Sequence, residues 1–325
     1  MKKQQGIALI TILVMVALAT ILAASMIKHQ TNMRENTDYL KRQNQSLLYA
    51  KSAEYFFQEM LIDDAKNAGN VDHLNESWAK PMPAFPVDGG FIMGVIQDES
   101  GKFNLNNLLK KDGVVNEPAK LWFERLLVRV GLPAQLSEAV IDWQDENDEP
   151  VGSMGAESSY YLGLQNGYSP SNQKFYNIEE LKRVRGFDGN NYKLIEPYIT
   201  AHPNVETQVN VNTASGLLLA SLSTELDPIV IQQELDQRKL NLQYLESVDA
   251  LWSLDSMKSI DSEGKKLFAS LLGVKSNYFK AKIDVMLNDR KRQFTSYLLR
   301  NDQKVYVTSR SLAPFSSLMA IKPLE

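Results

Sequence analysis

The chain has 325 residues, a net charge of −4 at neutral pH and no cysteine. This length suffices for an anchor and two domains, and 44% hydrophobic with 23% charged residues is typical of a folded protein. The acidic balance argues against a general binder of nucleic acid or anionic lipid. The absence of cysteine excludes thiolate catalysis and cysteine-based zinc sites, and three scattered histidines give little support for a serine triad. We therefore do not expect an enzyme.

The N-terminus is a short polar leader followed by a long apolar stretch. The leader ends at Gly6, and residues 7–27 are apolar and uncharged. As a helix with a rise of about 1.5 Å per residue, this stretch is long enough to cross a bilayer core of about 30 Å. Lys2 and Lys3 favour a cytoplasmic N-terminus, which sends residue 28 onward across the membrane. An ordinary signal peptide has its cleavage site after the apolar region, whereas here the glycine precedes it.

This order resembles the class III leader of type IV pilins and type II secretion pseudopilins. The resemblance implies cleavage by a prepilin peptidase between Gly6 and Ile7, followed by methylation of the new N-terminus. An unprocessed N-terminal anchor is the alternative. Most pilins have a glutamate at the fifth residue of the mature chain, but Thr11 stands here. A carboxylate inside a bilayer is costly and is kept only for a role. A long chain that lacks this glutamate resembles the K component, a minor pseudopilin proposed to sit at the tip.

Residues 28–66 keep apolar side chains at helical spacing and contain few helix breakers. We predict one helix from Ile7 to about Lys66, on the order of 90 Å long, with its first half in lipid and its second half on a globular head. The proline- and glycine-rich segment 81–90 is predicted to be a linker. Residues 91–97 are predicted to form a strand that turns back at 98–101 into residues 102–105.

A second β-rich block closes the chain. The runs 278–286, 292–299 and 304–311 are separated by Asn-Asp pairs and predict an antiparallel meander. The residues between the two β blocks are mostly helical in pattern. We predict an α+β fold with these parts: leader 1–6, N-terminal helix 7–66 (transmembrane 7–27), pilin-like α/β head 67–106 and 276–325, and inserted α-helical domain 107–275. Two consecutive domains are the alternative, but they would leave the strands near residue 95 without a sheet.

The strongest local feature is acidic. From residue 131 to 173 the chain has no Lys or Arg, but it has Glu138, Asp142, Asp145, Glu146, Asp148, Glu149 and Glu157. Carboxylates this dense repel one another unless they are solvated or bridged by a cation. Asp145, Asn147 and Glu149 alternate oxygen ligands along the loop, and Glu157 could return to complete an oxygen cage suited to Ca²⁺. The loop is not an EF-hand, because Pro150 stands where that loop needs glycine. A solvated acidic turn is the alternative.

Several unlinked motifs together resemble the type II secretion minor pseudopilin K family. Residues 142–150, with Gly155-Ala-Glu157 and Tyr160-Tyr161, look like its calcium-binding segment. Residues 103–108 and 209–214 resemble two further family segments. The resemblance implies a structural Ca²⁺, with Asp142, Asp145, Asn147, Asp148, Glu149 and Glu157 as the candidate ligands. Ser158 stands where relatives often have an acidic residue, which puts a second ion in doubt.

Residues 178–187, followed by a helical segment 192–198, resemble a helix-hairpin-helix. In DNA-binding hairpins the glycine lets backbone amides approach a phosphate, with basic side chains nearby. The basic residues available here are Lys182, Arg183, Arg185 and Lys193. The acidic head favours a structural hairpin instead, so we expect no nucleic-acid partner. A membrane-anchored DNA-binding protein and a type IV minor pilin are the alternative functions.

The family resemblance implies a tip subunit of the periplasmic pseudopilus. Such a subunit initiates fibre assembly and supports export of folded proteins across the outer membrane. The implied partners are the I and J minor pseudopilins, the prepilin peptidase and the inner membrane. The implied location is a single-pass inner-membrane protein with a cytoplasmic N-terminus and a periplasmic head, incorporated at the pseudopilus tip.

Overall fold

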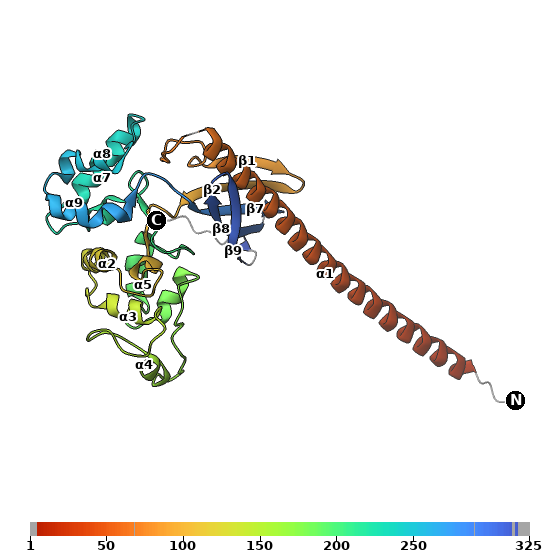
Figure 1. Cartoon of the computed structure of the whole chain (residues 1–325). Coiled ribbons are helices and arrows are strands. Elements are labelled where there is room, and N and C mark those ends of the chain that lie inside the picture. The colour runs from red at the N-terminus through yellow and green to blue at the C-terminus, as the bar shows by residue number, and fades with distance from the viewer. Residues whose placement is uncertain (1–4, 68, 289, 314–315, 318–325) are drawn as a thin grey trace.

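The computed structural model describes residues 5–67, 69–288, 290–313 and 316–317 (Figure 1). Most of the predicted leader, residues 1–4, lies outside the described residues. The fold is α+β, as predicted: one long helix, an antiparallel sheet and a group of shorter helices beyond the sheet. Figure 1 shows this helical group at the end of the molecule opposite the N-terminus.

Helix α1 (Gln5–Asn67) is continuous over 63 residues, which corresponds to about 95 Å at 1.5 Å per residue. This confirms the predicted single helix. Residues 8–41 are all exposed, and an 18-residue window within this helix has a mean hydropathy of 2.6. In the described part of the chain, α1 is the one helix long and apolar enough to cross a membrane.

The second half of α1 packs on the sheet. Ala50, Ala53, Phe57 and Leu61 recur every three to four residues and are buried, so they form one face of the helix. Gly94 lies below this face, where an added Cβ would be 2.8 Å from the Phe57 ring. The absence of a side chain there therefore allows α1 to approach the sheet closely.

The main sheet is formed by both ends of the globular region. Its path runs β1-β2-β7-β8-β10, and β9 also pairs with β8; all pairings are antiparallel. The strands are β1 (Met82–Val87), β2 (Gly90–Asp98), β7 (Tyr278–Leu287), β8 (Arg290–Asn301), β9 (Lys304–Leu312) and β10 (Ser316–Ser317). The meander predicted for the C-terminal block is therefore confirmed by β7, β8 and β9. The β2–β7 pairing runs from Gly90 opposite Leu287 to Asp98 opposite Phe279.

Two local predictions were wrong. Segment 81–90 is not a linker, because β1 occupies most of it; its prolines are tolerated because β1 is an edge strand. Residues 102–105 do not pair with β2, whose two sides are already occupied by β1 and β7. Instead β3 (Phe103–Asn104) pairs in parallel with β4 (Ile199–Thr200).

The helical part lies between β2 and β7 in sequence. Its α-helices are α2 (Glu117–Arg129), α3 (Leu136–Asp142), α4 (Ser158–Leu162), α5 (Asn190–Ile195), α6 (Gly216–Ala220), α7 (Pro228–Leu240), α8 (Val248–Trp252) and α9 (Ser262–Phe268). Its 3₁₀ helices are η1 (Leu105–Leu108), η2 (Ile178–Arg183), η3 (Glu196–Tyr198), η4 (Asp255–Met257) and η5 (Ala269–Leu271). Two further short strands, β5 (Val209–Asn210) and β6 (Leu272–Gly273), pair in parallel.

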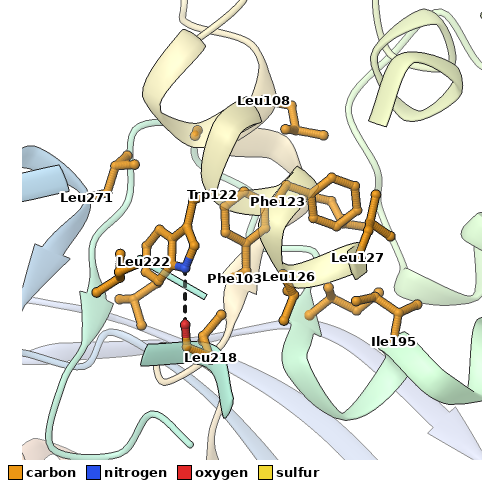
Figure 2. Close-up of a cluster of buried hydrophobic side chains, with 14 of the residues drawn as sticks. Phe103, Leu108, Trp122, Phe123, Leu126, Leu127, Ile195, Leu218, Leu222 and Leu271 are labelled. Carbon is orange, nitrogen blue, oxygen red and sulfur yellow. Dashed lines mark hydrogen bonds between the residues drawn. The ribbon is translucent and has the colours of Figure 1, made fainter. Parts of the chain in front are cut away.

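The helical part has its own hydrophobic core, centred on α2 (Figure 2). The Phe103 ring stacks on Phe123 at 5.3 Å and meets Trp122 edge-on at 5.6 Å. The Trp122 indole Nε1 donates to the Leu218 carbonyl at 3.1 Å, which satisfies its buried polar atom. This cluster shares no residue with the core between α1 and the sheet. The residue bounds predicted for the domains remain a prediction.

A buried polar network connects the two cores. Arg300 of β8 donates to Asp64 of α1 at 2.8 Å and also to Asp72. Asn210 from the helical part donates its Nδ2 to the Asp72 carbonyl at 2.9 Å. Ser276 donates from its backbone to the Asp72 carboxylate at 2.7 Å. Arg300 is therefore the cation that pairs with two buried carboxylates at this junction.

Replacing Arg300 by methionine should strongly destabilise the chain. The change leaves the Asp64 and Asp72 carboxylates buried without their ion-pair partner, which typically costs about 3–5 kcal/mol in the free energy of unfolding. Urea unfolding of the full chain in detergent would measure it. Lys258→Met, which removes an exposed pair with Asp255, is the control and should have no measurable effect. A loss below about 1 kcal/mol for Arg300→Met would contradict the interpretation.

Candidate metal centre

The candidate site is the acidic loop, defined here as residues 142–157, between α3 and α4. Asp142 is the last residue of α3 and Glu157 is the N-cap of α4, so two helices fix the ends of the loop. Inside the loop, the Asp142 carboxylate accepts from the Val151 amide at 3.1 Å and from the Ala156 amide at 2.6 Å. A Cβ on Gly155 would lie 2.5 Å from the same carboxylate, so this close approach requires glycine.

Three of the predicted ligands come together in this loop. Asp142, Asp145 and Glu157 each offer a carboxylate oxygen, and these atoms lie within 4.8 Å of one another. All three residues are buried; Asp142 is 0%, Asp145 8% and Glu157 1% exposed. Both Glu157 carboxylate oxygens and one of Asp145 are buried and have no hydrogen-bond partner among the described residues. Buried carboxylate oxygens without a partner are rare in folded proteins, and a bound cation would satisfy them.

The electrostatics of this carboxylate cluster agree with that inference. Burial, together with the nearby charges of Asp142, Asp145 and Asp148, raises the pKa of Glu157 to about 8, and burial is the largest of these causes. Burial likewise raises the pKa of Asp145 to about 6, with a smaller contribution from Asp142. The pKa of Asp142 is also raised, again mainly by burial. Without a cation, ionising all three groups is therefore unfavourable in the folded chain.

The donors in this cluster suit a hard cation. Each of the three side chains supplies carboxylate oxygen, and neither histidine nor cysteine takes part. Ca²⁺ accepts six to eight oxygen ligands in flexible geometry, whereas Mg²⁺ demands a tight octahedron. Asp142, Asp145 and Glu157 thus fit a calcium ion, and such an ion would neutralise their mutual repulsion.

A second group of carboxylates, Asp64, Asp72 and Glu76, also lies within 4.8 Å. It differs in one decisive respect, because Arg300 already forms ion pairs with Asp64 and Asp72. A bound cation would have to displace or oppose this buried guanidinium. Of the two groups, the acidic loop is therefore the better candidate for a metal site.

The other predicted ligands lie on the exposed part of the acidic loop. Asn147 accepts from the Glu149 amide at 2.8 Å, and Asp148 accepts from the Ser158 amide at 3.0 Å. Both contacts shape the loop, and neither Asp148 nor Glu149 belongs to the cluster of three carboxylates. Their coordination of a metal stays a prediction. Sequence reasoning gave Glu138 no role, yet its carboxylate accepts from the Met154 amide at 2.7 Å. Its position four residues before Asp142 on α3 could have indicated this.

The hairpin segment contacts this loop through one of its basic residues, Arg185. Residues 178–183 form the 3₁₀ helix η2 rather than a longer helix to Arg185, because the backbone is extended at Val184. Lys182 pairs with Glu179 and lies 4.5 Å from the Tyr192 ring centroid. Arg185 donates to the Gly155 carbonyl at 3.0 Å. Of the four basic residues available to the hairpin, Arg185 is thus partly buried against the loop, while Lys182, Arg183 and Lys193 are exposed.

The chain is similar to one family of known proteins. Family models described as type II secretion system protein K match residues 101–204 and 209–275. The type II secretion system protein K of Pseudomonas aeruginosa is 33% identical over 321 residues, covering 95% of this chain and 93% of the relative. That of Klebsiella pneumoniae is 30% identical over 320 residues, covering 95% and 96%.

A solved structure supports the same similarity. It is a chain in the crystal structure of the GspK-GspI-GspJ complex from the enterotoxigenic Escherichia coli type 2 secretion system. The TM-score is 0.76 at 26% identity, and the match covers 86% of this chain and 99% of that chain. The similarity therefore extends beyond the acidic loop to nearly the whole fold.

The metal-free chain should lose stability as pH rises. The folded pKa of Glu157, about 8, lies above its ordinary value of 4.5, so the folded state holds the extra proton between these values. Stability contributed by this group is complete below about pH 4.5 and is lost as pH rises towards 8. Thermal unfolding in chelator from pH 5 to 8 would measure the slope. Glu157→Gln should flatten it and Glu146→Gln, on the exposed part of the loop, should not; equal slopes in all three proteins would refute the assignment.

Proposed function

Because the chain belongs to the type II secretion system protein K family, we propose that it is the tip subunit of a periplasmic pseudopilus. There it initiates fibre assembly and supports export of folded proteins, as a structural and not a catalytic subunit. The observation that carries this proposal is the match over 99% of a chain crystallised in the GspK-GspI-GspJ complex. By analogy, this chain assembles with the I and J minor pseudopilins.

The long helix supplies the physical basis for assembly. Its first half is apolar and exposed, so it has no partner within the described chain. In the inner membrane, lipid covers these side chains; outside the membrane, only like helices can cover them. Entry into a fibre and extraction from the membrane are then one process. The head, which follows this segment, lies in the periplasm, and the N-terminus is cytoplasmic.

Two features support a place at the tip. After cleavage between Gly6 and Ile7, the fifth residue is Thr11, so the chain has no carboxylate there to pair with the terminal amine of a neighbouring subunit. The helical part also lies beyond the sheet, at the end opposite the N-terminus (Figure 1). Among the described residues, this helical part contains no second long apolar helix on which the helix of another pilin subunit could stack.

The acidic loop binds a structural Ca²⁺ in this proposal. Asp142, Asp145 and Glu157 hold the ion, and Asn147, Asp148 and Glu149 supply further oxygens or keep the loop in shape. The support comes from the unpartnered buried oxygens of Asp145 and Glu157. The bound ion contributes only its positive charge. This charge offsets the repulsion between carboxylates that arises when α3 and the start of α4 come together.

The first test concerns processing and partners. The wild-type chain isolated from membranes should begin at Ile7, carry a methylated amine and co-isolate with the I and J components. Gly6→Leu should stay uncleaved and fail to support secretion, because a side chain at this position blocks the peptidase; Gln5→Ala is the matched control and should be processed. Mass spectrometry of the N-terminus decides. A wild-type protein that retains Met1, or that leaves I and J behind, would argue against the proposal.

The second test concerns calcium. An ion at a hundredfold excess over its Kd stabilises the folded state by about 2.7 kcal/mol. For a chain of 325 residues that unfolds as one unit, this corresponds to roughly 4 °C in unfolding temperature. Chelator should lower the unfolding temperature of the full chain by this amount, and Ca²⁺ should restore it more fully than Mg²⁺. Asp145→Ala should remove the response and Glu146→Ala should keep it. Unchanged melting in chelator, with no calcium in a metal analysis, would show that the loop is merely solvated.

A further inference from the structure

The hairpin segment contacts the acidic loop through Arg185, on both sides of Glu157. Its Nη1 donates to the carbonyl of Gly155 at 3.0 Å, and its guanidinium lies 4.9 Å from the Tyr160 ring centroid. Its backbone amide donates to the Tyr161 hydroxyl at 3.2 Å. One residue therefore touches the chain two residues before Glu157 and three and four residues after it.

The hairpin is in turn fixed to the helix that carries Asp142. Gly186, next to Arg185, has φ +84° and packs so closely on the Leu136 side chain that a Cβ there would clash. Leu181 and Phe187 on either side are fully buried. Leu136 begins α3 and Asp142 ends it. The hairpin thus connects the outgoing side of the loop, α3, with its returning side, residues 155–161.

From this geometry we infer that Arg185 is a positioning residue for the calcium site, holding Glu157 against Asp142 and Asp145. The inference rests on the calcium binding proposed above. The guanidinium donates to a backbone carbonyl, and among the described residues no carboxylate forms an ion pair with it. The loop carboxylates are therefore left free for the metal. A planar guanidinium can stack on Tyr160 while donating sideways to Gly155, which an ammonium cannot do in the same way.

This role also accounts for the likeness to a DNA-binding hairpin. The glycine and the basic residues are present, but Arg185 points into the chain. There it serves a loop with six carboxylates, in a stretch of chain (residues 131–173) that has no Lys or Arg of its own. The anionic group that the hairpin organises is a metal-binding loop, not a phosphate.

The sign of one measurement separates positioning from simple electrostatics. Removing a positive charge near a cation site should tighten Ca²⁺ binding by Coulomb's law alone. Loss of a positioning contact should weaken it, typically by about 10–100-fold for residues that support metal ligands. We expect Arg185→Met to bind Ca²⁺ at least ~10-fold more weakly than the wild type, by calorimetry on the full chain in detergent.

Two variants of the same segment complete the design. Arg183→Met removes a neighbouring exposed charge and should bind Ca²⁺ as tightly as the wild type or slightly more tightly. Arg185→Lys keeps a donor for Gly155 but loses the planar stacking on Tyr160, so it should recover only part of the affinity, which a general weakening of the hairpin would not allow. If Arg185→Met binds Ca²⁺ as tightly as the wild type or more tightly, the inference is wrong.

Hydrogen exchange in chelator tests the contact independently of the metal. Arg185→Met should speed exchange of the Ala156 amide, which donates to Asp142, and Arg183→Met should not. A wild-type chain that takes up no Ca²⁺ would defeat the calcium proposal. Exchange then decides the positioning role by itself: faster exchange in Arg185→Met supports it, and unchanged exchange overturns it.

Discussion

The pairing of β2 with β7 is the constraint on which the rest of the structure depends. It places Asp98 opposite Phe279, so the residues between these strands leave and re-enter the sheet side by side. We call the junction where β2 ends and β7 begins the neck. The helical part must fold as a unit with its own core, because it meets the sheet mainly at this neck. The buried network around Arg300 lies at the same place and joins α1, β8 and the helical part. Position and orientation of the acidic loop relative to the sheet therefore rest on a few polar contacts.

A cluster of unpartnered carboxylates opposes folding, and the surrounding packing holds it in place. Trp143 follows Asp142 and meets Tyr161 edge-on at 5.3 Å, while Tyr161 is fully buried near the end of the return segment. Aromatic burial therefore brings together carboxylates that would otherwise separate. The pKa of Glu157 rises to about 8 because it is buried beside other acids. A divalent ion would relieve this repulsion without any rearrangement of the cluster.

Sequence reasoning predicted what depends on local pattern. The spacing in α1 and the alternation in β7 to β9 repeat over many residues, so periodicity alone was sufficient for both. It failed for β1, because prolines mark an edge strand as readily as a linker. It also failed for residues 102–105, whose partner β4 lies almost a hundred residues away. At the site, the acidic run pointed to Asp145 and Glu157. It could not show which of the seven acidic residues come together, nor that Arg185 contacts the loop at Gly155.

The two cores differ in how directly they depend on the proposed ion. The sheet with α1 is held by apolar packing along Ala53, Phe57 and Leu61, and no metal ligand proposed here lies in it. The loop sits in the other core, beside Trp143 and Tyr161. Loss of an ion would therefore raise the free energy of the helical part first. That change would reach the sheet through the neck, where Asp98 accepts hydrogen bonds from Ser276 and Thr213 at 2.5 Å, and through Tyr176, which donates to the Thr308 carbonyl of β9 at 3.1 Å. With the proposed ion in the loop, the N-terminal helix can stay intact on removal of the ion while the order of the distal helical part is lost.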